Sequence, residues 1–548
     1  MPDLDETTRR RSIELVLEDK LGHDALRPGQ LEAVESVLSG RDTLCVMSTG
    51  SGKSAVYQLA GFLLDGPVVV VSPLIALQQD QIDALEEDAA ALNSTLTTSE
   101  RDEVFRRATS GELTFLLLAP EQLADPSVVG ALAEAGVALF VVDEAHCVSQ
   151  WGHDFRPDYL RLRSAIEGLG RPPVLALTAT AAPPVRDEIV AALGMDDPEV
   201  IVRGFDRPNI RLEVVRHDDA EIKHRALVER VVEVAGPGRP GIVYCATKRE
   251  AERTADELAG LGVRAAHYHG GLSPTARAER QAQFMDDAEL DVMVATIAFG
   301  MGIDKSDVRW VFHHDVSESV DAYYQEIGRA GRDGEPAEAV LFYRPQDLGL
   351  RRFFASGRVA HDELEQVAQA LLEHHGPVDP AELAESLPLS DTKLTTAVQH
   401  LEEAGLAHVR DDGLLEADRD ADLEEVVGRA DEAEEHRQAF DRSRVDMMRA
   451  YAEGSGCRRA FVLGYFGEGY EPPCGSCDTC DRIADAPGAG AVADATPAPF
   501  TAGQRVEHEE WGTGTVGQVD RGQVTVVFDT VGYKTLGLDL VLDRGLLR

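Results

Sequence analysis

The chain has few basic residues for its length. Its 548 residues include 53 Lys and Arg against 97 Asp and Glu, a formal net charge of −44. Proteins that bind nucleic acid usually carry a basic surplus, so this balance by itself argues against a DNA-binding protein. Two explanations remain for a nucleic-acid protein of this kind: a local basic stripe on an acidic body, or the acidic surface of a salt-adapted organism. We favour the second.

Long apolar runs are also absent. No 18 consecutive residues are apolar, and the first six residues include Asp3, Asp5 and Glu6. We therefore expect neither a membrane span nor a secretory signal, and a cytoplasmic location without a membrane partner. The composition, 43% hydrophobic and 27% charged, is typical of globular proteins, and the length predicts several domains.

Cysteine is scarce, and most of it is grouped. Three of the seven cysteines, Cys45, Cys147 and Cys245, lie in apolar or motif segments and are expected to be reduced packing residues. The other four follow the spacing Cys-x16-Cys-x2-Cys-x2-Cys, at Cys457, Cys474, Cys477 and Cys480. Four sulfurs with two-residue gaps suit a structural tetrahedral Zn²⁺, which would fold its module and do no chemistry. Disulfides are the weaker alternative in a cytoplasmic chain.

A glycine-rich stretch lies near the N-terminus. Residues 47–54 read MSTGSGKS, after an apolar run (43–46) that predicts a strand and before a run (55–59) that predicts a helix. This context is typical of a loop whose backbone N–H groups and following helix bind phosphates. We expect Lys53 to reach the β- and γ-phosphates of a nucleotide and the Ser54 hydroxyl to bind Mg²⁺. The alternative is a plain turn before a lysine, since Met47 stands where the general pattern has glycine. The predicted contacts are Thr49, Gly50, Ser51, Gly52, Lys53 and Ser54.

A second motif follows about ninety residues later. The apolar run 138–142 ends in Asp143 and Glu144. A carboxylate at the tip of a strand beside a phosphate loop lies where nucleotide-bound Mg²⁺ needs a ligand. We therefore expect Asp143 to bind the metal and Glu144 to polarise the attacking water. The alternative is a solvated acidic turn.

Strands and helices alternate through the first 350 residues and predict two doubly wound parallel sheets. The second sheet begins after about residue 205 and has no phosphate loop. It carries Arg329 and Arg332, three residues apart on an expected helical turn that would point both side chains one way. Arginines that reach across a cleft stabilise charge on a transferring phosphoryl group, so we expect them to complete the site. Surface salt bridges are the alternative.

Several motifs together indicate a family. They are Arg27-Pro28-Gly29-Gln30, the loop at 49–54, DEAHCVSQWGHDFRP at 143–157, TAT at 178–180, FDRPN at 205–209 and QEIGRAGRDG at 325–334. With these motifs the chain resembles the RecQ family of DNA helicases, in helicase superfamily 2, over about residues 10–350 and 430–482. The four-cysteine segment resembles the zinc module of that family.

The resemblance implies further roles. Trp151, Phe155 and Arg156 would sense single-stranded DNA and couple it to ATP hydrolysis, because aromatic rings stack on bases and arginine pairs with phosphate. Gln30, beside Arg27, would read the adenine edge, although by position alone a surface glutamine is equally expected. Asp304 would contact the ribose or the other lobe. Leu26 departs from the aromatic residue that the family leads us to expect, which weakens the expected adenine stacking.

The composition changes after residue 357. Helical runs and two short strands at 358–425 predict a winged-helix-like domain. Residues 358–440 contain 22 Asp and Glu against 6 Lys and Arg, so a protein-contact or structural role is favoured over DNA binding. The family order places the zinc module first, so no strand-separating hairpin is assigned.

The C-terminal segment has its own pattern. A linker rich in Ala, Pro and Gly precedes alternating apolar and polar residues that predict a small five-stranded barrel. With the turn Trp511-Gly512-Thr513-Gly514, the barrel resembles the SH3-like or Tudor-like tail of UvrD-type helicases. The resemblance implies a docking module for protein or nucleic acid; a cap without separate function is the alternative.

We therefore expect an α/β protein with two tandem RecA-like lobes, followed by smaller modules. The expected segments are a first RecA-like lobe (1–204), a second RecA-like lobe (205–357), a winged-helix-like domain (358–425), a zinc-binding module (426–483), a linker (484–500) and a small SH3- or Tudor-like β-barrel (501–548). The expected activity is ATP-dependent unwinding of duplex DNA by 3′→5′ movement on single-stranded or forked DNA, in repair and recombination. The alternatives are an RNA helicase, a duplex-remodelling translocase that does not unwind, and a nucleic-acid-bound scaffold whose binding ATP gates.

Overall fold

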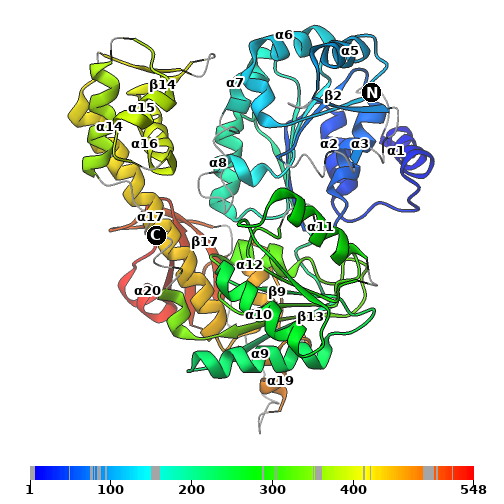
Figure 1. Ribbon diagram of the computed structural model, residues 1–548, viewed down its shortest axis with the longest axis vertical. Helices are drawn as coiled ribbons and strands as arrows, with labels where there is room; N and C mark the ends of the chain where they lie inside the picture. The colour runs from blue at the N-terminus through cyan, green and yellow to red at the C-terminus, as the bar shows by residue number, and fades with distance from the viewer. Residues whose placement is uncertain are drawn as a thin grey trace.

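The computed structural model describes residues 6–548 except 49, 74–77, 79–80, 83–84, 86–87, 93–95, 150–158, 160, 287–288, 301–302, 304, 350, 352–360, 375, 390, 411–413, 420, 486–498, 502–503 and 521. Two parallel-sheet lobes lie one above the other, and smaller modules lie beside them (Figure 1). None of the described helices is long and apolar enough to cross a membrane.

The first lobe contains a seven-stranded sheet in the order β3-β4-β2-β5-β6-β1-β7, with every neighbouring pair parallel. Its strands are β1 (Thr43–Met47), β2 (Val68–Val71), β3 (Ala89–Leu92), β4 (Phe115–Leu118), β5 (Leu139–Val142), β6 (Val174–Thr178) and β7 (Glu199–Arg203). Its helices are α1 (Glu6–Leu21), α2 (Gln30–Leu38), α3 (Lys53–Leu63), α5 (Thr98–Thr109), α6 (Pro126–Ala135), α7 (Leu162–Gly168) and α8 (Pro183–Leu193). The central strands are buried along their whole length, because helices cover both faces of such a sheet.

The second lobe repeats this plan with six parallel strands in the order β10-β11-β9-β12-β13-β8. Its strands are β8 (Ile210–Arg216), β9 (Gly241–Tyr244), β10 (Ala265–Tyr268), β11 (Val292–Ala295), β12 (Trp310–His313) and β13 (Ala337–Tyr343). Its helices are α9 (Ala220–Val234), α10 (Lys248–Gly260), α11 (Pro274–Met285) and α12 (Val320–Ile327). The expectation of two doubly wound parallel sheets is confirmed.

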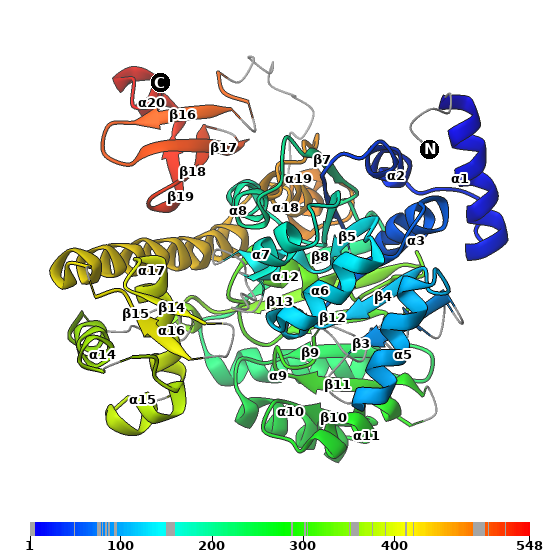
Figure 2. The ribbon, with the colours of Figure 1, turned by 90° about the horizontal axis from the view of Figure 1, so that it is seen from above.

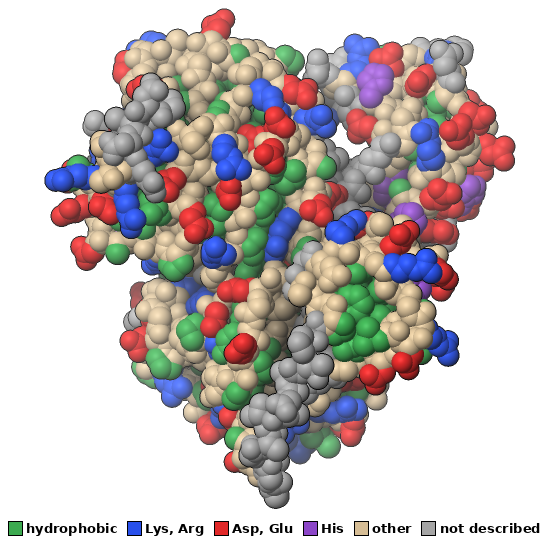
Figure 3. All heavy atoms as spheres, turned by 180° about the vertical axis from the view of Figure 1, so that it is seen from behind, with side chains coloured by type: hydrophobic (Ala, Val, Ile, Leu, Met, Phe, Trp, Pro, Cys, Tyr) green, Lys and Arg blue, Asp and Glu red, His purple; other side chains and the backbone are tan. Residues whose placement is uncertain are grey.

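A small helical module follows the lobes and has a hydrophobic core of its own. It contains α14 (His361–Glu373), α15 (Pro380–Ser386), α16 (Asp391–Glu403) and an antiparallel hairpin of β14 (Ala407–Val409) and β15 (Leu415–Ala417). These are the helices and hairpin of the expected winged-helix-like segment. On the face shown in Figure 3, acidic side chains lie along the outer edge of this module, and acidic and basic side chains are interspersed over the lobes.

One long helix, α17 (Leu423–Glu453), connects this module to the rest of the molecule (Figure 1). Val426, Val427 and Ala430 near its start complete the core of the winged-helix-like module. Met448 and Tyr451 near its end join the core of the lobes. The helices α18 (Arg458–Tyr465) and α19 (Asp478–Ala484) follow and belong to the four-cysteine segment.

The described residues of the C-terminal module form four antiparallel strands and a helix, so the expectation of five strands is wrong. The strands are β16 (Arg505–His508), β17 (Gly512–Asp520), β18 (Gln523–Phe528) and β19 (Gly532–Gly537), followed by α20 (Leu538–Arg544). Leu538 and Val541 pack on the sheet while Leu540 and Leu542 are exposed. That spacing of three is the period of a helix face. The sheet lies beside α17 (Figure 2).

Candidate active site between the two lobes

The glycine-rich loop connects β1 to α3 at the carboxyl edge of the first sheet. Gly50 and Gly52 have φ of 79° and 76°, the left-handed region that favours glycine, and α3 begins at Lys53. The Lys53 ammonium donates to the carbonyl oxygen of Met47 at 3.2 Å and lies 3.5 Å from that of Ser48. The Ser51 hydroxyl oxygen is buried and has no hydrogen-bond partner among the described residues. The loop thus offers a lysine, a helix N-terminus and an unused hydroxyl to an anion. Ser54 lies in the first turn of α3.

Two carboxylates lie beside this loop at the end of β5. Asp143 is buried and accepts hydrogen bonds from the Glu144 backbone N–H at 3.0 Å and the Ser72 hydroxyl at 3.5 Å. Burial and the charge of Glu144 raise the pKa of Asp143 to about 7, while Lys53 opposes the shift. Burial also lowers the pKa of Lys53, and the two carboxylates oppose that shift. Charges of both signs therefore share one poorly hydrated site, which suits a magnesium–phosphate group. Ser72 was not singled out from the sequence.

A chain of polar contacts leads from Glu144 to the second lobe. Glu144 Oε2 lies 3.3 Å from Nδ1 of His146, which lies 2.9 Å from the Thr178 hydroxyl at the end of β6. The Thr180 backbone N–H donates to the Thr178 hydroxyl at 3.2 Å. The Gln325 amide, on α12, donates to the Thr180 hydroxyl at 3.2 Å. Sequence reasoning quoted TAT and QEIGRAGRDG as motifs but missed this contact between them.

The two arginines of the second lobe lie on turns after α12, which ends at Ile327, and not on a helix as expected. Gly331 and Gly334 have positive φ, so the chain beyond α12 leaves the helical path and forms turns. A Cβ placed on Gly50 would lie 3.8 Å from Cγ of Arg332, so Arg332 reaches the phosphate loop across the cleft. Its charge contributes to the lowered pKa of Lys53. Arg329 is buried beside Tyr244 of its own lobe, whose pKa burial raises to about 12 while Arg329 opposes the shift.

Arg27 and Gln30 hold the phosphate loop from the other side. Arg27 donates from its guanidinium to the Gly50 carbonyl oxygen. The Gln30 amide donates to the carbonyl oxygens of Ser51 at 3.1 Å and Gly52 at 2.8 Å, and accepts from the Arg27 backbone N–H at 2.7 Å. Both side chains therefore position the loop backbone. The expected adenine contact of Gln30 stays a prediction.

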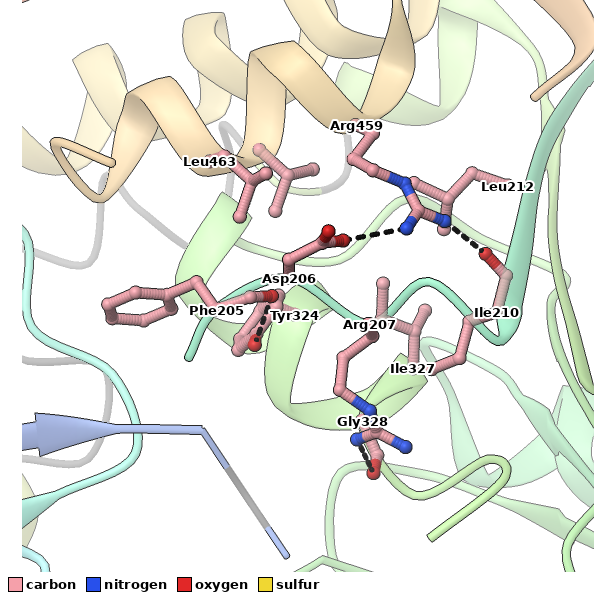
Figure 4. A pocket seen from close by; sticks show the side chains of 11 residues that line it. Phe205, Asp206, Arg207, Ile210, Leu212, Tyr324, Ile327, Gly328, Arg459 and Leu463 are labelled. Atoms are coloured by element: carbon pink, nitrogen blue, oxygen red, sulfur yellow. Dashed lines mark hydrogen bonds and ion pairs between the residues drawn. The ribbon is translucent and has the colours of Figure 1, made fainter. Parts of the chain in front are cut away.

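The segment that connects the lobes (205–209) positions the turns that carry Arg329 and Arg332 (328–334), here called the arginine turn (Figure 4). Arg207 donates to the backbone carbonyl oxygens of Gly328 at 3.1 Å and Ala330 at 2.7 Å. The Tyr324 hydroxyl, on α12, donates to the Phe205 carbonyl oxygen at 2.8 Å. The sequence signal for these residues was the FDRPN motif, but its role was not predicted. The remaining expected site residues, Thr49, Trp151, Phe155, Arg156 and Asp304, lie outside the described residues.

The four cysteines come together as predicted. The sulfur atoms of Cys457, Cys474, Cys477 and Cys480 all lie within 4.8 Å of one another, and those of Cys474 and Cys480 are 3.8 Å apart. Tetrahedral Zn²⁺ with Zn–S bonds of about 2.3 Å separates its sulfurs by about 3.8 Å, so the cluster fits the metal.

The module containing these cysteines is tied to the second lobe. The Leu212 backbone N–H donates to the Ser476 carbonyl oxygen at 3.1 Å. Arg459 pairs with Asp206 at 2.6 Å and donates to the Ile210 carbonyl oxygen at 2.8 Å (Figure 4). The cysteine cluster therefore supports the same connecting segment that holds the arginine turn.

Comparison with known proteins agrees with this geometry. Residues 27–189 match the DEAD/DEAH box helicase family, residues 223–334 the helicase conserved C-terminal domain, and residues 419–481 the RecQ zinc-binding family. The chain is 37% identical over 467 residues to the probable ATP-dependent DNA helicase RecS of Bacillus subtilis, covering 84% of this chain and 90% of that protein. The chain belongs to the RecQ family of ATP-dependent DNA helicases.

Two other relatives, both RecQ helicases, are longer than this chain. It is 35% identical over 482 residues to the ATP-dependent DNA helicase RecQ of Pasteurella multocida and 43% identical over 337 residues to that of Bacillus subtilis. It spans 63% and 56% of their lengths, and the matches cover 87% and 61% of this chain. Among solved structures, the DNA-bound DUF1998 helicase MrfA aligns with a TM-score of 0.51 at 19% identity, over 77% of this chain and 60% of that one. This likeness shows the shared fold.

Proposed function

We propose that this RecQ-family chain unwinds duplex DNA by moving 3′→5′ along single-stranded DNA, with ATP hydrolysed between its two lobes. The observation that carries the proposal is the pairing of Lys53, Asp143 and Glu144 on one lobe with Arg332 on the other. Because the site needs both lobes, binding of ATP closes the cleft and release of products opens it, and this cycle moves the strand. Its role would lie in DNA repair and recombination.

Each residue of the site has a proposed task. Lys53, Ser54 and the backbone of residues 49–52 hold the phosphates, and Asp143 with Ser54 would hold Mg²⁺. Glu144 orients the attacking water, and Arg332, with Arg329 behind it, stabilises charge on the transferring phosphoryl group. Magnesium, when bound, neutralises charge on the phosphate oxygens. The buried Ser51 hydroxyl and the carboxylate beside Lys53 support this assignment.

We propose that DNA is sensed by Trp151, Phe155 and Arg156 and that the signal passes through the first lobe to the site. The contact between Thr180 and Gln325 supports a route, because it joins the Glu144 chain of contacts to α12. Arg27 and Gln30 place the loop, Gln30 reads adenine, and Asp304 contacts the ribose or the facing lobe. We also propose the boundaries of the six segments given above. A cytoplasmic location and a protein partner at the C-terminal sheet remain proposals as well. So does a protein-contact or structural role for the acidic winged-helix-like module.

The Lys53→Ala variant tests the site. ATP hydrolysis with and without single-stranded DNA should fall to background, because the ammonium that binds the phosphates is gone. Thermal melting should change by no more than about 1 °C, since Lys53 is only partly buried and its hydrogen bonds go to the carbonyl oxygens of Met47 and Ser48 in the same loop. Lys20→Ala is the matched control, because Lys20 is a half-exposed surface lysine that pairs with Asp88 and lies over the Phe62 ring. Turnover that survives in Lys53→Ala would overturn the assignment.

Tailed duplexes test the direction and the substrate. A DNA duplex with a 3′ single-stranded tail should unwind, whereas a 5′ tail or an RNA duplex should not. ATP hydrolysis without strand separation would instead support the duplex-remodelling translocase. Repeating the assay up to molar KCl tests the salt-adapted origin, because ordinary phosphate contacts weaken steeply with salt.

A further inference from the structure

A second group of metal-binding side chains lies in the second lobe, apart from the four cysteines. His224 is on α9, Glu250 is in the first turn of α10, and His314 follows β12 directly. Nδ1 of His224 lies 3.3 Å from Nε2 of His314. Oε1 of Glu250 lies 3.4 Å from the first nitrogen and 3.5 Å from the second. The three atoms form a nearly equilateral triangle.

The size of this triangle matches a metal site. Zinc bonds to histidine nitrogen and carboxylate oxygen measure about 2.0–2.1 Å, which places tetrahedral ligand atoms about 3.3–3.4 Å apart. The triangle therefore has the size that one face of a tetrahedron around a single ion would have, with the fourth corner open. Three side chains from three separate elements meet this condition together.

Carboxylates behind the imidazoles determine where the protons are. Nε2 of His224 lies 2.8 Å from Oε2 of Glu257, and Nδ1 of His314 lies 3.0 Å from Oδ2 of Asp315. An ionised carboxylate only accepts, so each of these nitrogens carries the ring N–H. The two nitrogens that face each other then both present lone pairs. This is the arrangement that second-shell carboxylates impose on metal-bound histidines.

The Glu250 oxygen needs a partner. Its Oε1 atom is buried and makes no hydrogen bond among the described residues, and its nearest cation is Nη1 of Arg253 at 3.6 Å. The buried Lys223 ammonium is engaged by Asp315 at 3.2 Å and Asp347 at 2.6 Å. Three electron-pair donors therefore converge on one point without a hydrogen between them, and a divalent cation at that point satisfies all three.

We propose that His224, Glu250 and His314 bind a zinc ion with one open position. A nearby group of similar composition shows the contrast. In His269, Nδ1 accepts from the Gly271 backbone N–H at 3.2 Å and Nε2 lies 2.9 Å from Glu252, so both nitrogens are engaged. The bound zinc would join α9 and α10 to the carboxyl end of β12. That strand leads through residues 314–319 to α12 and the arginine turn, so the metal would stiffen the lobe that carries Arg332.

The metal content of the full-length chain tests the proposal. After equilibration with zinc and removal of excess, elemental analysis should find two zinc ions per wild-type chain, one in the cysteine cluster and one here. His314→Gln and Glu250→Gln should each lose one equivalent. His267→Gln, from the contrasting group, should keep both. One equivalent in the wild type, or two in His314→Gln and Glu250→Gln, would overturn the proposal.

Cobalt provides a measurement that needs no variant. In wild-type protein loaded with Co²⁺, the cysteine cluster should give thiolate charge-transfer bands. The proposed site has no thiolate ligand, so it should add visible bands but no charge-transfer bands of this kind. Thiolate bands alone, at one equivalent, would show that a shared proton rather than a metal joins the two imidazoles. When the cysteine cluster is already filled with zinc, further zinc should raise the melting temperature of the wild type but not that of Glu250→Gln, because only a ligand that binds the folded chain stabilises it.

Discussion

The C-terminal sheet is held on α17 through Gly532, and an alanine there should release it. Gly532 has a φ of 68°, and a Cβ on it would lie 2.3 Å from Oγ of Ser443 and 2.9 Å from the Phe440 ring. Next to it, the Tyr533 backbone N–H donates to the Ser443 hydroxyl at 2.9 Å, and its ring stacks on Tyr465 at 5.0 Å. Gly532→Ala therefore introduces backbone strain and also a clash with α17.

The cost of the clash can be separated from that of the strain. A left-handed non-glycine residue costs about 1–2 kcal/mol at either position. Gly522 has a φ of 80° with open space around it, so Gly522→Ala has only this cost and is the matched control. Gly532→Ala adds overpacking of about 1–3 kcal/mol and loss of a hydrogen bond worth about 0.5–1.5 kcal/mol. The docked state should thus lose about 2–4 kcal/mol more in Gly532→Ala than in Gly522→Ala.

Hydrogen exchange of the Tyr533 amide and of α17 around Ser443 measures this difference. Each 1.4 kcal/mol is about tenfold in the opening equilibrium, so exchange should speed up about thirtyfold to several hundredfold relative to Gly522→Ala. Equal acceleration in both variants, or unchanged protection around Ser443 in Gly532→Ala, would refute the reasoning. DNA-stimulated ATP hydrolysis of both variants then shows whether docking affects the motor.

Three further predictions concern the motor and its metal. The pKa of Asp143 lies near 7 in the fold, so the wild type loses stability as pH rises from about 4 to 7. In magnesium-free buffer without chelator, Asp143→Asn should be more stable than the wild type at pH 8, by at most about 4 kcal/mol at ~1.4 kcal/mol per pKa unit, and should melt at a higher temperature; the difference should be smaller at pH 5. The exposed Asp102→Asn should show no such trend. Gln325→Ala, which loses the Thr180 contact, should lower kcat of DNA-stimulated hydrolysis about two- to tenfold; a rise in KM for ATP alone would instead make Gln325 a nucleotide contact. Cys477→Ser should abolish zinc at the four-cysteine cluster and lower the melting temperature by several degrees, and retention of that zinc by elemental analysis would contradict it.

Much of the site was predictable because its chemistry is local in the chain. Residues 47–54 combine strand, loop and helix start within one stretch, and Asp143 directly follows an apolar strand. The cysteine spacing likewise predicted a cluster that the structure brings within 4.8 Å. Within each motif the order along the chain implies the local geometry, and Asp143 was expected beside the loop because the carboxyl ends of parallel strands meet at one edge of the sheet.

Predictions from local sequence patterns were wrong where the secondary structure of a segment depends on packing against another part of the fold. A five-stranded barrel was expected at the C-terminus, but residues 538–544 form a helix after four strands, and Leu538 and Val541 pack on the sheet at helical spacing. The arginines near 330 continue a helical pattern, but Gly331 and Gly334 adopt positive φ and carry the chain into turns. Glycine permits this turn conformation, and the hydrogen bonds from Arg207 to the carbonyl oxygens of Gly328 and Ala330 stabilise it.

The sequence alone indicated a RecQ-type helicase and predicted a phosphate-binding loop, a metal-binding carboxylate and a cluster of four cysteines. Tertiary structure alone decided which distant side chains meet. Gln325 reaches Thr180 between the lobes, Gly532 lies on Phe440 and Ser443, and His224, Glu250 and His314 converge in the second lobe. The physical reason is that such contacts depend on the packing of whole lobes and modules, a property that no stretch of neighbouring residues encodes.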